Sequence, residues 1–450
     1  MLKSNGGSKG EGVLGFTDMW AIGIGQVIGA GVITLIGPAI AMTGASVWIA
    51  YIAAILLGAL TIIPIIIFSS VTKYTGGDYS VITSLAGERL GGMYIVGFFM
   101  QMLGMSIFVT ALGMYAESLY PNINGKIVGV VILIILYFIN MLGMANMARF
   151  QKIMSAILIA TLMMFVVVGA TKADFSQSMS FKESNLFSGG TKGFMSAVML
   201  LVYSCQGYKF NVNYGGQAKN PTRTIPYSML AVIPVLIVAY AGVALIDASI
   251  LPISEVSGKP LTMAAKAILP NTLFYIFIYG GPVTALITTM NSNFSAMVGP
   301  FSRAARDGWF PEGLARTNSK GAATVILTIQ LIVGLVPVIL GFSVSIVVNN
   351  FMLVTSVYQF MIFYSLSKVP QKMPEKWKKS VFYCSNTVYY SILIIACAAQ
   401  LLIMVYSFKN LTAELAIFNV VALVICFTYA IFRHKSGKTH VDTEGMVELS

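Results

Sequence analysis

Apolar segments long enough to cross a membrane alternate with short polar connections along almost the whole chain. A transmembrane α-helix needs about 20 consecutive, mostly apolar residues. The pattern therefore predicts an all-α polytopic membrane protein with twelve transmembrane helices. The predicted crossings cover residues 16–42, 45–72, 91–119, 126–145, 149–171, 193–216, 226–250, 271–300, 322–342, 344–367, 381–407 and 412–433.

Two of these segments are interrupted by glycine. The first carries Gly25, Gly29 and Gly31, and the second carries Gly207 in its middle. Glycine destabilises a helix interior, so such runs favour unwinding of the backbone. Unwound backbone at membrane depth is tolerated only where protein packs around it or where it lines a wet cavity. The alternative is that these glycines only allow close packing between helices.

The interrupted segments open the two halves of the chain in corresponding positions. A pair of broken helices in such positions indicates the binding site of a transporter. We therefore predict a 5+5 inverted repeat with helices 1 and 6 unwound, followed by two appended helices. The predicted units are an N-terminal tail at 1–15, a first repeat at 16–171, a second repeat at 193–367, helices 11 and 12 at 381–433, and a C-terminal tail at 434–450.

Basic residues gather on one side of the predicted membrane. If the N-terminus lies inside, 20 of the 28 lysines and arginines fall on its side, seven fall on the other side, and Lys209 lies within a crossing. This bias follows the positive-inside rule, so we expect a protein of the plasma (cell) membrane with both termini cytoplasmic. The net charge of +12 then reflects topology. Because the basic residues are scattered over short loops, a nucleic-acid surface is a poor interpretation.

Composition argues against a soluble domain and against a catalytic centre. Only 10% of the residues are charged, whereas a soluble domain carries about 25%. The four cysteines lie in apolar segments, and the two histidines lie in the C-terminal tail. With no CxxC pair and no histidine cluster in the sequence, we expect no metal site and no cofactor. No nucleophile–base pair falls within the apolar segments, so an enzyme is not expected.

Four short motifs occur in order along the chain. Residues 28–32 read IGAGV, residues 76–79 read GGDY, residues 220–226 read NPTRTIP, and residues 302–311 read SRAARDGWFP. Together they resemble the signatures of the amino acid–polyamine–organocation (APC) permease family. The resemblance covers nearly the whole chain and implies the leucine-transporter fold, in which an amino acid binds beside the breaks in helices 1 and 6.

The resemblance also implies a set of substrate contacts. The amides of Ala30 and Gly31 are expected to hold an α-carboxylate, because a half-helix N-terminus favours an anion. The carbonyls of Val27, Tyr203 and Gln206 are expected to receive the α-ammonium. The full set of expected substrate-binding residues is Val27, Ile28, Gly29, Ala30, Gly31, Tyr203, Ser204, Cys205, Gln206, Gly207 and Tyr208.

Several side chains near the second break allow more than one interpretation. Tyr203 has the place of an aromatic gate, although aromatics also anchor helices at the membrane interface. Gln206 and Tyr208 either set side-chain selectivity or join helices. Lys209 stands where the family usually has an acid, and a lysine within a crossing is a functional candidate. It pairs with an acidic substrate, replaces a coupling cation, or reaches toward the cytoplasm.

Positions that differ from the family pattern limit which coupling ions and protein partners can be expected. Leu158 stands where some relatives carry a fifth-helix lysine that replaces sodium, so that proton mechanism does not transfer. The polar residues of helix eight, including Thr289 and Asn293, offer oxygens to an ion or serve helix packing. Residues 117–126 contain no cysteine, so a disulfide-linked heavy subunit is not expected. We expect a monomer or homodimer in contact with membrane lipid.

Three functions compete. The first is a secondary active amino acid transporter that works by alternating access, as an exchanger or a proton-coupled symporter, with a neutral amino acid favoured. The second is a carrier of an organic amine such as ethanolamine or a polyamine, which Lys209 opposes by its charge. The third is a transporter-like nutrient receptor, which the short tails disfavour.

Overall fold

The computed structural model describes residues 12–120, 122–176, 178–179, 186–341, 344–409, 411–443 and 445–446. Within these residues the chain is all-helical, and an isolated bridge between Leu14 and Ala218 is the only strand-like pairing. The prediction of an all-α membrane protein is therefore confirmed. Eight helices of the described chain are long and apolar enough to cross a membrane, and the count of twelve and the inverted repeat stay predictions.

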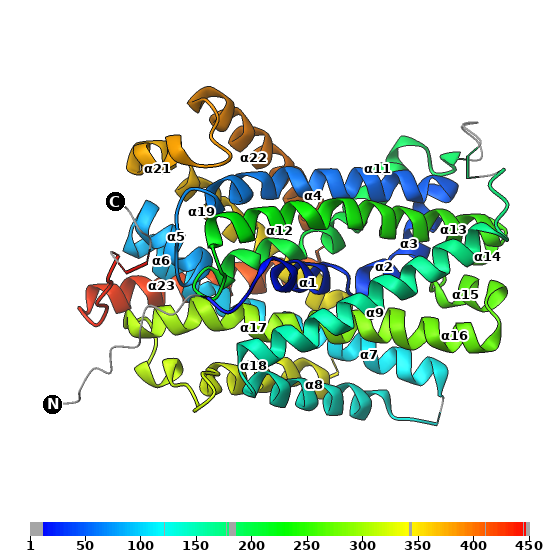
Figure 1. Ribbon diagram of the computed structural model, residues 1–450, viewed down its shortest axis with the longest axis horizontal. Helices are drawn as coiled ribbons and strands as arrows, with labels where there is room; N and C mark the ends of the chain where they lie inside the picture. The colour runs from blue at the N-terminus through cyan, green and yellow to red at the C-terminus, as the bar shows by residue number, and fades with distance from the viewer. Residues whose placement is uncertain are drawn as a thin grey trace.

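The long helices run mostly along one axis of the molecule, and α1 lies in the middle of the bundle (Figure 1). The first half contains α1 (Phe16–Val27), α2 (Ala30–Thr34), α3 (Ile36–Thr43), α4 (Val47–Ser69), α5 (Gly77–Ala86), α6 (Glu88–Phe98), η2 (Phe99–Gly104), α7 (Met105–Leu119), α8 (Gly125–Met141) and α9 (Met144–Ala170). The second half contains α11 (Gly190–Val202), η3 (Tyr203–Cys205), η4 (Gly207–Tyr214), α12 (Pro221–Leu236), η5 (Ile237–Ala241), α13 (Gly242–Ile250), α14 (Ile253–Val256), α15 (Thr262–Ile268), α16 (Asn271–Ile278), η6 (Tyr279–Val283), α17 (Thr284–Arg306), η7 (Glu312–Ala315), α18 (Thr324–Ile339) and α19 (Val344–Leu366). The remaining helices are α20 (Val369–Lys372), α21 (Pro374–Lys379), α22 (Asn386–Lys409) and α23 (Ala413–Lys435).

The first glycine-rich segment is interrupted as predicted. Helix α1 ends at Val27, and Ile28 and Gly29 leave the helical region with ψ angles of 87° and −145°. The helix resumes at α2 and passes through Leu35 into α3, because the Leu35 amide donates to the Gly31 carbonyl at 2.9 Å. The break therefore leaves the first amides of a new helix without partners in their own helix.

The second segment is interrupted in a different way. Helix α11 ends at Val202, and the chain continues as two stretches of 3₁₀-helix joined at Gln206, with three residues in η3 and eight in η4. A 3₁₀-helix is tighter than an α-helix and rarely extends beyond three or four residues, so a longer stretch marks strain or a hinge. The break is thus a change of helix type around Gly207 and not an extended gap.

The C-terminal tail packs on one end of the bundle, beside α5 and α6 (Figure 1). The Thr75 amide donates to the Met446 carbonyl at 2.8 Å, and the His440 amide donates to the Asp307 carbonyl at 2.9 Å. The Met446 side chain is only 1% exposed. Near the other terminus, the Leu14 amide donates to the Gln217 carbonyl at 2.9 Å. We call this end, with α5 and both terminal segments, the terminal end.

Replacing Met446 by alanine tests this docking of the tail. Burial of a methionine side chain contributes roughly 1.5–3 kcal/mol. We expect Met446→Ala to release the tail locally, so that the amides of residues 75 and 440 exchange hydrogen at least tenfold faster in deuterium-exchange mass spectrometry. Met114→Ala is the matched control, because Met114 is 60% exposed. Unchanged exchange in the Met446 variant would contradict the docking.

Candidate functional site

The two interrupted segments lie against each other in the centre of the bundle. A Cβ atom on Gly207 would collide with the carbonyl oxygen of Gln26, and one on Gly31 would collide with the side chain of Ser204. Glycine is therefore required at both positions for the two backbones to approach this closely. The sequence offered packing and unwinding as alternatives for these glycines, and the structure shows both at once.

Side chains from neighbouring helices bind the backbone exposed by the first break. The Tyr240 hydroxyl donates to the Val27 carbonyl at 2.7 Å, and the Thr289 hydroxyl donates to the Gly25 carbonyl at 2.8 Å. Tyr240 lies in η5, a π-helical turn that follows Pro234. π-helical turns are rare in proteins, and those that occur often lie at functional sites. Two partner helices thus hold the broken helix in position.

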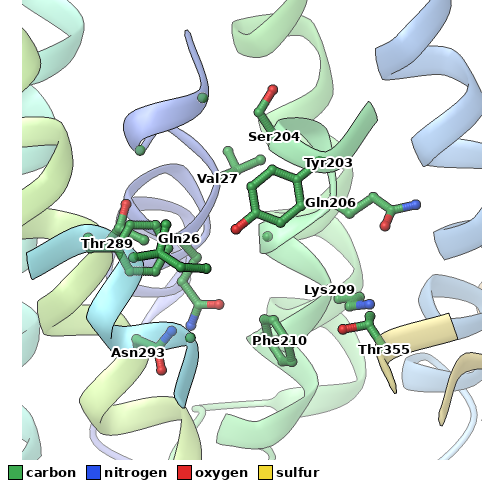
Figure 2. A pocket seen from close by; sticks show the side chains of 16 residues that line it. Gln26, Val27, Tyr203, Ser204, Gln206, Lys209, Phe210, Thr289, Asn293 and Thr355 are labelled. Atoms are coloured by element: carbon green, nitrogen blue, oxygen red, sulfur yellow. The ribbon is translucent and has the colours of Figure 1, made fainter. Parts of the chain in front are cut away.

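A cavity of about 90 Å³ lies between the breaks. One water needs roughly 10–15 Å³ on this measure, so the cavity has room for several non-hydrogen atoms. In Figure 2 the ring of Tyr203 lies across the space, with Phe210 below it and Thr289 and Gln26 opposite. The lining residues are Gln26, Val27, Gly29, Gly31, Gly104, Ile107, Phe108, Tyr203, Ser204, Gln206, Gly207, Lys209, Phe210, Thr289, Asn293 and Thr355.

Most of the residues expected to bind substrate lie at this cavity. Those that line it are Val27, Gly29, Gly31, Tyr203, Ser204, Gln206 and Gly207, together with Lys209. Ile28, Cys205 and Tyr208 are fully buried and do not line the cavity. Ala30 begins α2, and its side chain lies outside the described part of the structure. The binding role of the whole set stays a prediction.

Other lining residues escaped the sequence reasoning. Ile107 and Phe108 come from α7, and Thr355 comes from α19. No glycine break or family motif marks these helices, so only their packing around the breaks places them here. Gln26, beside the first break, also lines the cavity, although the glycine pattern alone does not predict this. Its side-chain amide lies near the Tyr214 hydroxyl, 3.4 Å away.

The polar residues of helix eight, α17, mostly serve packing. The Asn291 amide donates to Gln151 at 2.7 Å and accepts from Asn140 at 2.9 Å, which joins three helices. Thr289 and Asn293, in contrast, reach the cavity. The packing interpretation therefore fits part of this helix and leaves two polar side chains at the site.

Lys209 lies in the cavity wall and not at the membrane surface. Its side chain is buried with 9% exposure, so the alternative in which it extends to the cytoplasm does not describe this structure. Its ammonium donates to the Gln359 amide oxygen at 3.4 Å and lies 5.4 Å from the centre of the Phe210 ring. Of the lining residues, Lys209 is the only one with a formal charge, and Figure 2 shows it beside Thr355.

The side chain of Gln206 points away from the cavity, as Figure 2 shows. Its amide donates to the Thr61 hydroxyl at 3.0 Å, and the Gln359 amide donates to the Thr61 carbonyl at 3.3 Å. Thr61 on α4 therefore connects Gln206 with the partner of Lys209. This fits the alternative in which Gln206 joins helices.

Comparison with known proteins identifies the family of the chain. The family model "Amino acid permease" matches residues 14–432. The chain is 23% identical to the branched-chain amino acid permease BcaP of Lactococcus lactis, over 82% of this chain and 85% of the relative. It is 26% identical to the methylthioribose transporter of Bacillus subtilis, over 67% and 68% of the two chains. It is 24% identical to the serine/threonine exchanger SteT of Bacillus subtilis, over 60% and 62%. The chain is an integral membrane protein and belongs to the amino acid permease family.

Proposed function

We propose that this chain is a secondary active transporter that carries a neutral amino acid across the plasma membrane by alternating access, as an exchanger or a proton-coupled symporter. The observation that carries the proposal is the cavity between two adjoining helix breaks. Broken helices of this kind form the substrate sites of transporters. The excess of basic residues on the terminal end supports a cytoplasmic location for both termini.

The backbone at the breaks fits the two charged groups of an amino acid. The amides of Ala30 and Gly31 begin α2, where backbone N–H groups and the helix dipole favour a carboxylate. The Val27 carbonyl already accepts from the Tyr240 hydroxyl and from the Gly29 amide at 3.0 Å. An incoming α-ammonium at this carbonyl therefore shares or displaces one of these donors.

The charge of the cavity disfavours a cationic side chain on the substrate. Two like charges 6 Å apart repel by about 3 kcal/mol at an effective dielectric constant of 20. Lys209 therefore opposes a lysine, an arginine or a polyamine in the cavity. No lining residue is acidic, so nothing in the wall offsets this repulsion.

The relatives widen the range of substrates to be tested. Their names include branched-chain amino acids, serine, threonine and methylthioribose. Methylthioribose has neither an α-carboxylate nor an α-ammonium. Because this relative also matches most of the chain, an uncharged thiosugar is the second candidate substrate.

Uptake by purified protein in proteoliposomes tests the function and its site together. We expect vesicles preloaded with neutral amino acids to accumulate labelled branched-chain amino acids, serine or threonine. Gly31→Ala places a methyl group against Ser204 and is expected to lower this uptake at least tenfold. Gly313→Ala is the matched control, because a Cβ there meets nothing within 4 Å.

The outcomes separate the candidates. If the protein takes up methylthioribose but no amino acid, the substrate is the thiosugar and not an amino acid. Absence of flux with amino acids, amines and methylthioribose would reject the transporter proposal for all of them. Equal uptake by the Gly31 and Gly313 variants would move the substrate site away from the breaks.

Removing the charge of Lys209 tests the selection against cations. We expect Lys209→Met to raise uptake of arginine or lysine relative to leucine by at least about tenfold, because the repulsion disappears. Lys266→Met is the matched control, since Lys266 is exposed on α15, outside the cavity. The measurement is competition against labelled leucine. An unchanged ratio would show that Lys209 does not contribute to selectivity.

A further inference from the structure

The charge in the cavity wall has an acidic neighbour outside the cavity. The family resemblance places an acid at the position of Lys209, and here a lysine stands there instead. The acidic residue near Lys209 is Asp78, which belongs to the GGDY motif at residues 76–79. The charges of Asp78 in that motif and Lys209 lie near enough to attract each other, although their side chains form no direct ion pair.

The structure holds Asp78 firmly against the helix that carries Lys209. The Asp78 amide donates to the Asn213 side chain at 3.3 Å, and Asn213 lies four residues after Lys209 in η4. A Cβ on Gly77 would collide with Asn213, so α5 begins in close contact with η4. On the opposite side, the Tyr94 hydroxyl donates to the Asp78 carboxylate at 3.4 Å.

Asp78 is buried, with an exposed fraction of 6%. Opening a water-filled path between the cavity and the terminal end would require α5 to separate from η4, because these two helices pack together there. Such an opening would transfer the Asp78 carboxyl from a buried site into water. Since a buried charge costs free energy and a neutral carboxyl costs much less, the proton on Asp78 and the separation of α5 are linked.

We propose that Asp78 is a proton-binding site on the terminal side of the cavity, with the ammonium of Lys209 as its counter-charge. This inference rests on the proposed transport function. The proton comes from water at the terminal end and binds a carboxylate oxygen of Asp78. A substrate group that engages Lys209 weakens the attraction and strengthens proton binding. Substrate binding and proton binding are thereby coupled through one lysine.

Burial is the main influence on the proton affinity of Asp78, which lies between the predicted crossings. The pKa of Asp78 is raised from 3.8 to about 6, because the effect of burial exceeds the lowering by the charge of Lys209 and by the hydrogen bond from Tyr94. The elements packed against α5 carry further titratable side chains, which are Tyr74 before α5, Tyr79 on α5, Glu88 and Arg89 on α6, Tyr208 and Tyr214 on η4, Arg303, Arg306 and Asp307 at the end of α17, Tyr358 and Tyr364 on α19, and Lys372 on α20. Arg303 and Asp307 bind each other with a closest distance of 3.3 Å.

The sign of the pH dependence follows from these values. A group whose pKa is higher in one conformation stabilises that conformation when the pH falls. Asp78 has a pKa of about 6 when α5 is packed on η4, and we expect its ordinary value of 3.8 when the two separate. Acidification from pH 7 to pH 5 therefore favours the packed conformation by about tenfold.

Infrared difference spectroscopy of the full-length protein tests the proton site without any substrate. We expect a band of protonated carboxyl that titrates near pH 6 and is absent in Asp78→Asn. Lys209→Met is expected to raise the midpoint by roughly one pH unit, because the counter-charge is lost. Lys209→Arg keeps the charge and is expected to keep the midpoint. Asp174→Asn, in an outer loop, is the control that retains the band.

A band titrating near pH 6 that has the same intensity in Asp78→Asn as in the wild type would overturn the proton site, and so would a wild-type protein without such a band between pH 5 and 7.5. An equal midpoint in the wild type and the Lys209→Met variant would overturn the coupling. Because the spectra need no transport, these results are independent of the uptake experiments.

A transport measurement then tests the link to gating. We expect wild-type uptake to fall about tenfold when the pH on the terminal side decreases from 7 to 5, and Asp78→Asn to remove most of this dependence. The effect of Lys209→Met on the pH profile is expected to vanish in the Asp78→Asn background, as for any coupled pair. A profile that stays steep without Asp78 would assign the coupling to another group.

Discussion

The structure depends on backbone N–H and C=O groups that form hydrogen bonds within the helix in an ordinary membrane-spanning segment. Two breaks leave such groups unpaired in the middle of the bundle, where no lipid can replace the missing partners. The chain resolves this by mutual support: glycines bring the two broken segments into contact, and hydroxyls of Tyr240 and Thr289 bind the carbonyls of Val27 and Gly25. What remains open between the segments is the cavity. The same constraint that makes the breaks costly therefore leaves a cavity with several polar groups in the middle of the bundle.

The electrostatic design of the site differs from what the family resemblance implies. The acid expected after Gly207 is a lysine, and an acid appears instead in the loop that begins α5. Lys209 lies at the cavity and Asp78 lies toward the terminal end. The cavity wall thus carries a positive charge, and the Asp78 carboxyl group lies buried between the cavity and the terminal end.

The terminal end is held by more than the transmembrane helices. Arg303 at the end of α17 contacts Asp307 and also donates to the carbonyls of Asp442 and Gly445 in the C-terminal tail. Tyr79, adjacent to Asp78, donates to the Asp307 carboxylate at 2.8 Å. The loop that carries Asp78, the end of α17 and the tail are therefore joined in one hydrogen-bonded layer. Any movement of α5 away from η4 has to rearrange this layer.

The sequence by itself determined the helical membrane fold and the location of both breaks, because apolar length and glycine runs such as Gly25 to Gly31 act locally. The count of twelve crossings and the inverted repeat stay predictions. Only the tertiary structure decided that Gln206 binds Thr61, that Cys205 and Tyr208 are buried outside the cavity lining, and that Thr355 lines the cavity. It also decided that Asp78 and Lys209 are neighbours, although 131 positions separate 78 from 209. The direction of side chains and the pairing of distant charges depend on how the helices pack, and local sequence patterns do not contain this information.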